Sequence, residues 1–132
     1  MFLSALENVS NNVKGGVIIA KSNPPEFGAG SNTINDVFGK TLNPWDISKT
    51  CGGSSGGSAV ALATGQVWLA TGSDLGGSLR IPASFCSVVG LRPTAGLVAH
   101  GPRILPFSNL AVEGPMGRNV MDLSLLLDAQ SG

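Results

Sequence analysis

The sequence contains 132 residues, which is enough for one domain with a modest hydrophobic core. Hydrophobic residues make up 42% of the chain and charged residues only 12%, a composition that excludes an intrinsically disordered protein. Eight basic and eight acidic residues leave no net charge, so we expect neither nucleic acid nor an anionic membrane as a partner.

The N-terminus lacks the basic start of a secretory signal, and no run of about 18 apolar residues predicts a membrane span. Two isolated cysteines, Cys51 and Cys86, are typical of a reduced protein of the cytoplasm, with a disulfide between them as the alternative. We expect no metal, because the chain has one histidine and no cluster of ligands. No cofactor motif is present, so we expect no cofactor either.

Apolar residues at helical spacing predict a helix over residues 1–14, which paired glycines then end. Residues 17–20, "VIIA", are typical of a short buried strand. Residues 21–50 contain three prolines and many polar residues, and we expect a loop there. Ser58 is then expected to cap a buried helix through residues 59–65.

Residues 67–74, "VWLATGSD", predict a strand that runs into a glycine-rich loop. After this loop we expect a short helix that is broken near Pro82. Residues 87–94 predict a second buried strand, ended by Pro93. Residues 95–117 are predicted to be irregular.

Asn119 resembles the cap of a last helix, because Asp122 follows three residues later. That helix, over residues 120–130, has an apolar face. Its members are Val120, Leu123, Leu126 and Leu127. Strands that alternate with helices predict an α/β fold, and no linker or repeat divides the chain, so we expect residues 1–132 to form one domain.

Two glycine- and serine-rich segments, which we call the first and second blocks, are "GGSSGGS" at residues 52–58 and "GSDLGGSLR" at residues 72–80. Their composition is typical of a flexible linker, but neither block joins two domains. Neither matches a phosphate-binding loop, which needs a lysine after its last glycine. Ser55 fits the G-x-S-x-G pattern of a hydrolase nucleophile with His100 as its base, although the residues before it make a poor strand.

The remaining interpretation is a serine nucleophile that works without histidine. A serine hydroxyl reacts only when a base takes its proton, and a lysine held neutral by burial can do this through a second serine. The oxyanion that forms needs fixed N–H donors, which consecutive amides of a glycine-rich turn supply. Residues 75–78, "LGGS", have that form.

The two blocks, extended to "GGSSGGSA" and "GSDLGGSLRIPASFCSVVGLRPTAG", resemble the signature region of the amidase signature family of serine hydrolases. "GGVIIAKSNPPEF" and "NPWDISKTCGGSSGGSA" resemble the segments that lead into it, and "VEGPMGRNVMDLSLLLDAQSG" resembles the segment that follows. The resemblance covers residues 15–132, whereas residues 1–14 are unlike the family.

The resemblance implies that Ser78, the serine of the second "GGS", is the nucleophile. It implies that Ser54 is the relay serine, which follows a cis peptide bond in the family. Ser55 would be a supporting serine that forms hydrogen bonds.

The resemblance also implies an oxyanion hole made by the amides of Leu75, Gly76 and Gly77, together with the amide of the nucleophile. Asp74 and Arg80 match positions whose polar contacts stiffen this loop in the family. A plain surface ion pair between these two side chains is the alternative.

In the family the proton acceptor is a lysine from a segment upstream of the signature, which the printed sequence does not contain. Lys21 matches a position that commonly holds a lysine other than the catalytic one. The family also continues past the matched residues with further strands and much of the substrate pocket. We therefore expect a truncated amidase-signature core, a short mixed sheet flanked by helices, with a rearranged and mostly helical fold as the alternative. Truncation leaves sheet edges uncovered, which predicts a homo-oligomer.

The expected function is that of a serine hydrolase that cleaves a small carboxylic ester or amide through an acyl-enzyme on Ser78. Esters are expected to be favoured, because an ester has the better leaving group and needs less proton donation. The alternative is an inactive amidase fragment, or an assembly module, that keeps the loops but lacks the base.

Overall fold

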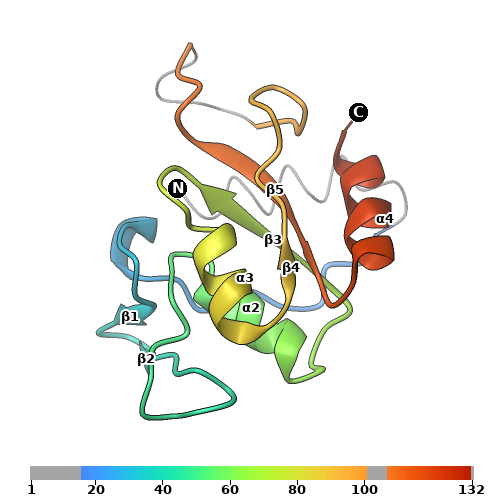
Figure 1. Cartoon of the computed structure of the whole chain (residues 1–132). Helices are drawn as coiled ribbons and strands as arrows, with labels where there is room; N and C mark the ends of the chain where they lie inside the picture. Colours follow the sequence, from blue (N-terminus) through green and yellow to red (C-terminus); the bar gives the residue numbers. More distant parts are fainter. Residues whose placement is uncertain (1–15, 101–106, 132) are drawn as a thin grey trace.

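The computed structural model describes residues 16–100 and 107–131. The helix predicted over residues 1–14 lies outside the described residues. In chain order the elements are η1 (Glu26–Gly28), β1 (Ile34–Asn35), β2 (Gly39–Lys40), α2 (Gly56–Ala63), β3 (Leu69–Asp74), α3 (Arg80–Cys86), β4 (Val89–Gly90), β5 (Val112–Gly117) and α4 (Val120–Gln130) (Figure 1). None of the helices in these two ranges is long and apolar enough to cross a membrane.

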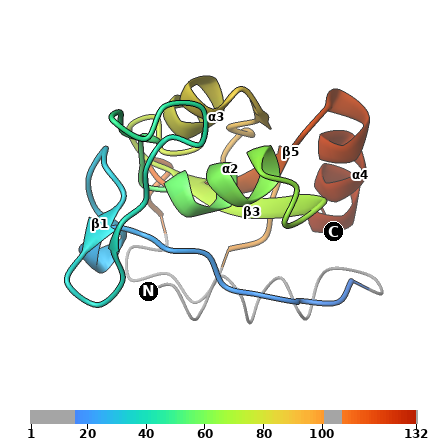
Figure 2. The same ribbon diagram turned by 90° about the horizontal axis from the view of Figure 1, so that it is seen from below.

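The main sheet has three strands in the order β3-β5-β4, and both strand pairs are antiparallel. Helices α2 and α3 lie on one side of β3, and the segment of residues 16–24, drawn in blue, passes on the other side (Figure 2). Helix α4 packs mainly against β5. This arrangement confirms the predicted α/β class, and the mostly helical alternative is wrong.

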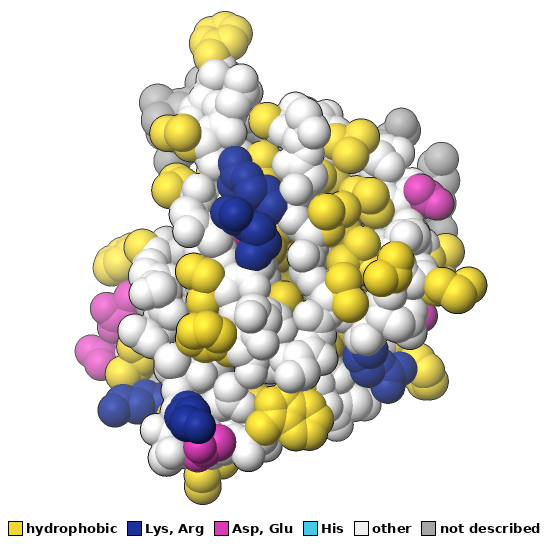
Figure 3. Space-filling view, viewed as in Figure 1, with side chains coloured by type: hydrophobic (Ala, Val, Ile, Leu, Met, Phe, Trp, Pro, Cys, Tyr) yellow, Lys and Arg dark blue, Asp and Glu magenta, His cyan; other side chains and the backbone are white. Residues whose placement is uncertain are grey.

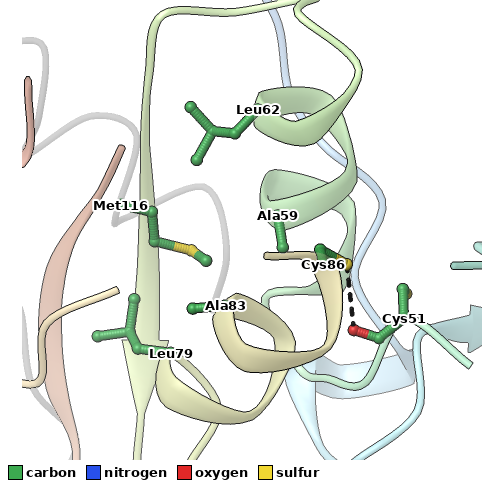
Figure 4. Packing of buried hydrophobic residues seen from close by; sticks show 7 residues of the cluster. All are labelled: Cys51, Ala59, Leu62, Leu79, Ala83, Cys86 and Met116. Carbon is green, nitrogen blue, oxygen red and sulfur yellow. Dashed lines mark hydrogen bonds between the residues drawn. The ribbon is translucent and has the colours of Figure 1, made fainter. Parts of the chain in front are cut away.

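The hydrophobic core lies between the sheet and helices α2 and α3 (Figure 4). Its buried members are Cys51, Ala59, Leu62, Leu79, Ala83, Cys86 and Met116. Leu79 is completely buried, and burying a leucine side chain contributes about 2 kcal/mol. Because Leu79 directly follows Ser78 in the chain, the core fixes one end of the second block.

Helix α4 begins where the sequence predicts. Asn119 caps it, because its side-chain oxygen accepts a hydrogen bond of 2.9 Å from the amide of Asp122. Leu123 and Leu126 on the predicted apolar face are buried. Val120, at the start of the helix, is 65% exposed, so the buried face is narrower than predicted.

The other two helices differ in detail from the prediction. Helix α2 begins at Gly56, so Ser58 lies inside the helix and does not cap it. The Ser58 hydroxyl instead donates to the carbonyl oxygen of Thr71 at 2.9 Å, which joins α2 to the edge of β3. Helix α3 continues past Pro82, so the predicted break there is wrong; a proline in the first turn removes no intrahelical hydrogen bond.

Two strand predictions are wrong, and the loop predicted over residues 21–50 contains the short antiparallel pair of β1 and β2. Residues 17–20 form no strand, and Val17 and Ile19 are 84% and 70% exposed. A strand needs a neighbour for its backbone groups, and none of the described segments pairs with these residues. Strand β5, in contrast, lies inside the stretch predicted to be irregular. That prediction follows from its composition, since residues such as Gly114 and Pro115 are typical of turns. Pairing with β3 and β4 on both sides overrides that local preference.

Candidate active site

Both glycine–serine blocks line one cavity of about 1190 Å³, and residues 16–24 contribute another part of its wall. The predicted site residues that line it are Ser54, Ser55, Leu75, Gly76 and Ser78. The fold therefore brings the predicted nucleophile and the predicted relay serine to one shared space.

Ser54 lies in the turn just before α2. The peptide bond between Gly53 and Ser54 is cis, as the family resemblance implies. Ser54 is only 2% exposed, and its hydroxyl forms no hydrogen bond with any residue that the structure describes. The same holds for the hydroxyl of Ser78 within the described ranges. Both hydroxyls are thus available to a substrate or a base in the cavity.

Ser55 ties the first block to the second block and to β3. Its hydroxyl accepts a hydrogen bond of 3.2 Å from the amide of Ser73 and donates one of 3.3 Å to the carbonyl oxygen of Ser73. Its own amide donates to the carbonyl oxygen of Ser78 at 3.2 Å. These contacts fit the supporting role, whereas a hydroxyl engaged by a strand edge is a poor nucleophile, so they do not favour the G-x-S-x-G interpretation.

Asp74 holds the second block, because its carboxylate is completely buried at the end of β3. The amide of Gly77 donates to Oδ1 at 2.8 Å, and the amide of Leu79 donates to Oδ2 at 3.2 Å. Arg80 binds the same carboxylate through Nε and Nη2, each at 3.0 Å. Since the two amides flank Ser78, the carboxylate fixes the main chain on both sides of that residue. A carboxylate with no exposed surface does not fit the surface ion-pair alternative.

The charge of Asp74 depends on these contacts. Burial alone would raise the pKa of its carboxyl, but hydrogen bonds from Arg80, Leu79 and Gly77 outweigh burial and lower the pKa to about 2, from 3.8. The carboxylate therefore stays ionised at neutral pH, where it keeps the second block in place.

The amides of Leu75, Gly76 and Ser78 donate no hydrogen bond to any described residue, and all three residues line the cavity. Gly77 differs, since its amide is committed to Asp74 and the residue does not line the cavity. The prediction that Gly77 contributes to an oxyanion hole does not fit this geometry. The physical reason is that the buried carboxylate needs N–H donors, and the Gly77 amide is one of them.

Arg92 is a charged residue next to the site that was not predicted from the sequence. Its Nη1 donates to the backbone oxygen of Asp74 and, at 3.1 Å, to Oδ1 of the same residue. Its Nη2 donates to the carbonyl oxygen of Leu110 at 3.0 Å. The one signal in the sequence is a basic residue inside "SVVGLRPT", a segment expected to be buried.

Two further ionisable residues line the same cavity. Nδ1 of His100 lies 3.3 Å from Oε1 of Glu113, and both side chains are half-buried. Glu113 sits on β5 directly opposite Ser73 on β3. Nothing in the sequence singled out Glu113, because it lies in the stretch that was predicted to be irregular.

Cys51 and Cys86 are free and buried. Burial raises the pKa of the Cys51 thiol, and burial followed by the neighbouring Cys51 raises the pKa of the Cys86 thiol to about 11. Both thiols are therefore protonated and poorly reactive at neutral pH. Across residues 16–100 and 107–131, no group of three or more His, Cys, Asp or Glu side chains is placed to hold a metal ion.

Comparison with known families gives a match to the family model described as Amidase over residues 11–132. Among individual relatives, a glutamyl-tRNA(Gln) amidotransferase subunit of Rubrobacter xylanophilus is 53% identical over 116 residues. The matched part is 88% of this chain and 24% of that relative.

Solved structures agree with this match. A 6-aminohexanoate cyclic dimer hydrolase has a TM-score of 0.88 and 40% identity, over 95% of this chain and 27% of its own chain. The corresponding glutamyl-tRNA(Gln) amidotransferase subunit of Thermotoga maritima has a TM-score of 0.82 and 42% identity, over 95% of this chain and 28% of its own. This chain thus spans about a quarter of the length of the proteins that it matches, and it belongs to the amidase family.

Proposed function

We propose that this chain carries the nucleophile of an amidase and hydrolyses carboxylic amide bonds through an acyl-enzyme on Ser78. The observation that carries the proposal is the shared cavity. It is lined by Ser54 and Ser78, whose hydroxyls bind no described residue, and by Leu75 and Gly76, whose amides, like that of Ser78, donate to none of the described residues. A nucleophile, a proton relay and N–H donors on one cavity are the parts that acyl transfer requires.

The chemistry proceeds in two halves. Ser78 Oγ attacks the substrate carbonyl carbon while its proton passes to Ser54, and the carbonyl oxygen becomes an oxyanion that the free amides of the second block stabilise. The tetrahedral intermediate then breaks its C–N bond, and the amine leaves with the proton that Ser54 returns to its nitrogen. Water attacks the acyl-serine in the second half and releases the acid, which restores Ser78.

Ser54 must pass its proton to a base, and the family resemblance implies a lysine amine for that role. Among the lysines of the described residues only Lys21 lines the cavity, and none of the described hydrogen bonds joins it to Ser54. A Lys21→Met variant therefore asks whether Lys21 acts as the base. We expect this variant to keep its reactivity, because Lys21 matches a family position that is not the catalytic one.

We propose that carboxylic esters are substrates too, and the more reactive ones. An alkoxide or phenolate leaves more easily than an amine, so an ester depends less on proton donation to the leaving group. A p-nitrophenyl ester and the matching p-nitroanilide compare the two classes directly, because both have the same acyl group.

Covalent labelling tests the proposal. A fluorophosphonate probe reacts only with an activated serine, and we expect the label on Ser78 in the wild type, none in Ser78→Ala, and slow labelling in Ser54→Ala. Ser84→Ala, which changes an exposed serine of α3, is the matched control and should label normally. If the wild type is not labelled, or if Ser78→Ala is labelled equally, the chain is an inactive amidase fragment or assembly module instead.

We also propose that the chain self-associates. Apolar side chains are spread over the surface (Figure 3), and those of Val17 and Ile19 on the segment beside the cavity are 84% and 70% exposed. Removing such side chains from water favours association. Light scattering at working concentration tests this expectation, and a monomer would contradict it.

A further inference from the structure

We propose that Arg92 is a positioning residue that fixes the oxyanion loop, residues 75–79, to the sheet through Asp74. The proposal rests on the proposed function of Ser78 and deepens it. Arg92 itself is not among the residues that line the cavity, so any effect on the reaction must pass through the residues that it holds.

Asp74 determines the position of the oxyanion loop. Its two carboxylate oxygens accept hydrogen bonds from two loop amides and from two arginines. The amides of Gly77 and Leu79 enclose Ser78 between them, so a movement of the carboxylate moves the nucleophile and the cavity-lining amides of the same loop. The conformation of the loop therefore depends on where the carboxylate of Asp74 is held.

The two arginines reach Asp74 from different parts of the fold. Arg80 comes from the first turn of α3, directly after the loop, and its side chain is 56% exposed. It binds Asp74 from the same stretch of chain that it helps to order. Arg92 comes from the segment after β4, and its side chain is 27% exposed. It is the arginine that reaches Asp74 from another part of the fold.

Arg92 is anchored to β5 through its own main-chain segment and through Leu110. The preceding residue, Leu91, donates its amide to the carbonyl oxygen of Pro115 on β5 at 3.2 Å, so this segment continues the pairing of β4 with β5. One nitrogen of Arg92 binds Asp74 and the other binds the carbonyl oxygen of Leu110, just before β5. The guanidinium thus joins the end of β3 to the start of β5, beside the loop.

The consequence concerns the transition state more than substrate binding. Without Arg92, Asp74 keeps its charge partner Arg80, but the carbonyl oxygens of Asp74 and Leu110 lose their common donor. The main chain of Asp74 stays paired with Val112, but its carboxylate is then held by Arg80 alone and can turn with α3, which shifts the loop amides that it binds and misaligns those of Leu75 and Gly76. Because oxyanion donors act only when they are aligned, we expect kcat to fall about tenfold or more while KM changes little.

Three variants of the full chain test this. Arg92→Met removes the donors, and Arg92→Lys keeps the positive charge but has one nitrogen, which cannot bridge Asp74 and Leu110. Arg118→Met is the matched control, because Arg118 follows the end of β5 that lies away from Asp74. Its Cζ atom lies 4.7 Å from the centroid of the Trp68 ring. The readouts are kcat and KM on a p-nitroanilide, the rate of fluorophosphonate labelling, Tm, and hydrogen exchange of the Gly77 and Leu79 amides by NMR.

We expect Arg92→Lys to keep a Tm near that of the wild type but to lose kcat severalfold, with faster exchange at Gly77 and Leu79. Arg118→Met should change none of these. Unchanged kcat and unchanged exchange in Arg92→Lys and Arg92→Met would overturn the proposal, as would equal effects in Arg118→Met. If Arg92→Met does not fold, Arg92→Lys alone decides.

The exchange measurement separates this inference from the proposed function. If Ser78 of the wild type takes no label, the proposed function is wrong, and the exchange rates of the two amides still decide whether Arg92 holds the loop. If the wild type is labelled but the Arg92 variants match it in every readout, the proposed function stands and Arg92 has no positioning role.

Discussion

In the first block the glycines lie against other parts of the chain, whereas Gly76 in the second block faces open space. A methyl group added at Gly56 would lie 2.6 Å from Sγ of Cys51, and one added at Gly57 would lie 2.6 Å from the backbone nitrogen of Asn23. A methyl group added at Gly76 would meet nothing within 4 Å. The two blocks look alike in sequence and both contain closely packed glycines, since a methyl group at Gly72 would lie 2.8 Å from Leu79. Gly76 differs from the glycines of the first block, because it leaves open space beside a main-chain amide that lines the cavity.

The comparison extends to what holds each block. The first block is buried throughout and is tied to β3 through Ser55 and Ser58. In the second block, the buried carboxylate of Asp74 fixes the main chain of the loop through the amides of Gly77 and Leu79. Substitutions in the first block should therefore lower mainly the stability of the fold. Substitutions around Asp74 in the second block should lower both the stability and the reactivity of Ser78.

The largest loss of stability is expected for Asp74→Asn. All described hydrogen bonds of the carboxylate come from N–H donors, so the side-chain NH2 group of an asparagine would point at other donors. The substitution also removes the negative charge that Arg80 and Arg92 share. Hydrogen bonds to a charged group contribute about 1.5–3 kcal/mol each, so losing several of them should lower the free energy of unfolding by about 3 kcal/mol or more. Urea denaturation measures it.

Asp46→Asn is the matched control for that experiment. Asp46 pairs with Lys49 at 3.0 Å, and the side chains are 41% and 71% exposed, so its loss should matter far less. Equal destabilisation by the two substitutions would contradict the central role of Asp74.

The second prediction concerns close packing in the first block. Gly57→Ala should lower the free energy of unfolding by about 2 kcal/mol, because the methyl group would collide with the main chain of Asn23. Main chain cannot turn aside as a side chain does, and a hydrogen bond of 2.9 Å between the hydroxyls of Ser22 and Ser58 keeps this segment against α2. Urea denaturation that shows no loss would mean that residues 22–24 do not lie where the structure has them.

The third prediction follows from the lowered pKa of Asp74. The folded-state pKa of about 2 lies below the ordinary 3.8, so the ionised carboxylate stabilises the fold above about pH 4. This contribution, about 2 kcal/mol, is lost as the pH falls from 4 to 2 and is absent below that range. Carbon NMR of the carboxyl group should give a titration midpoint near 2, and a midpoint near 3.8 would show that the amides and arginines do not bind it.

These features differ in how far the sequence predicts them. The start of α4 depends on Asn119 and Asp122, three residues apart, and such local contacts are visible in a sequence. Strand β5 contains Gly114 and Pro115, and it becomes a strand only because β3 and β4 flank it, so its local composition misleads. Residues 17–20 show the converse, since an apolar run without a neighbouring strand forms none.

The candidate site divides in the same way. Ser54 and Ser78 follow from the family resemblance, because their motifs are contiguous. The commitment of the Gly77 amide and the reach of Arg92 to Asp74 do not follow, since each depends on side-chain directions or on contacts between residues far apart in the chain. Such contacts are settled by tertiary packing.

The smallest expected change in stability is that of Gly76→Ala, which sharpens the comparison of the two blocks. Gly76 has open space where the methyl group would lie and needs no left-handed backbone, so the free energy of unfolding should stay within about 0.5 kcal/mol of the wild type. The methyl group would however enter the cavity beside an amide that we propose as an oxyanion donor. We therefore expect slower labelling of Ser78 at unchanged stability, the reverse of Gly57→Ala. If Gly76→Ala unfolds as easily as Gly57→Ala, Gly76 serves close packing as Gly57 does, and the difference between these two glycines is wrong.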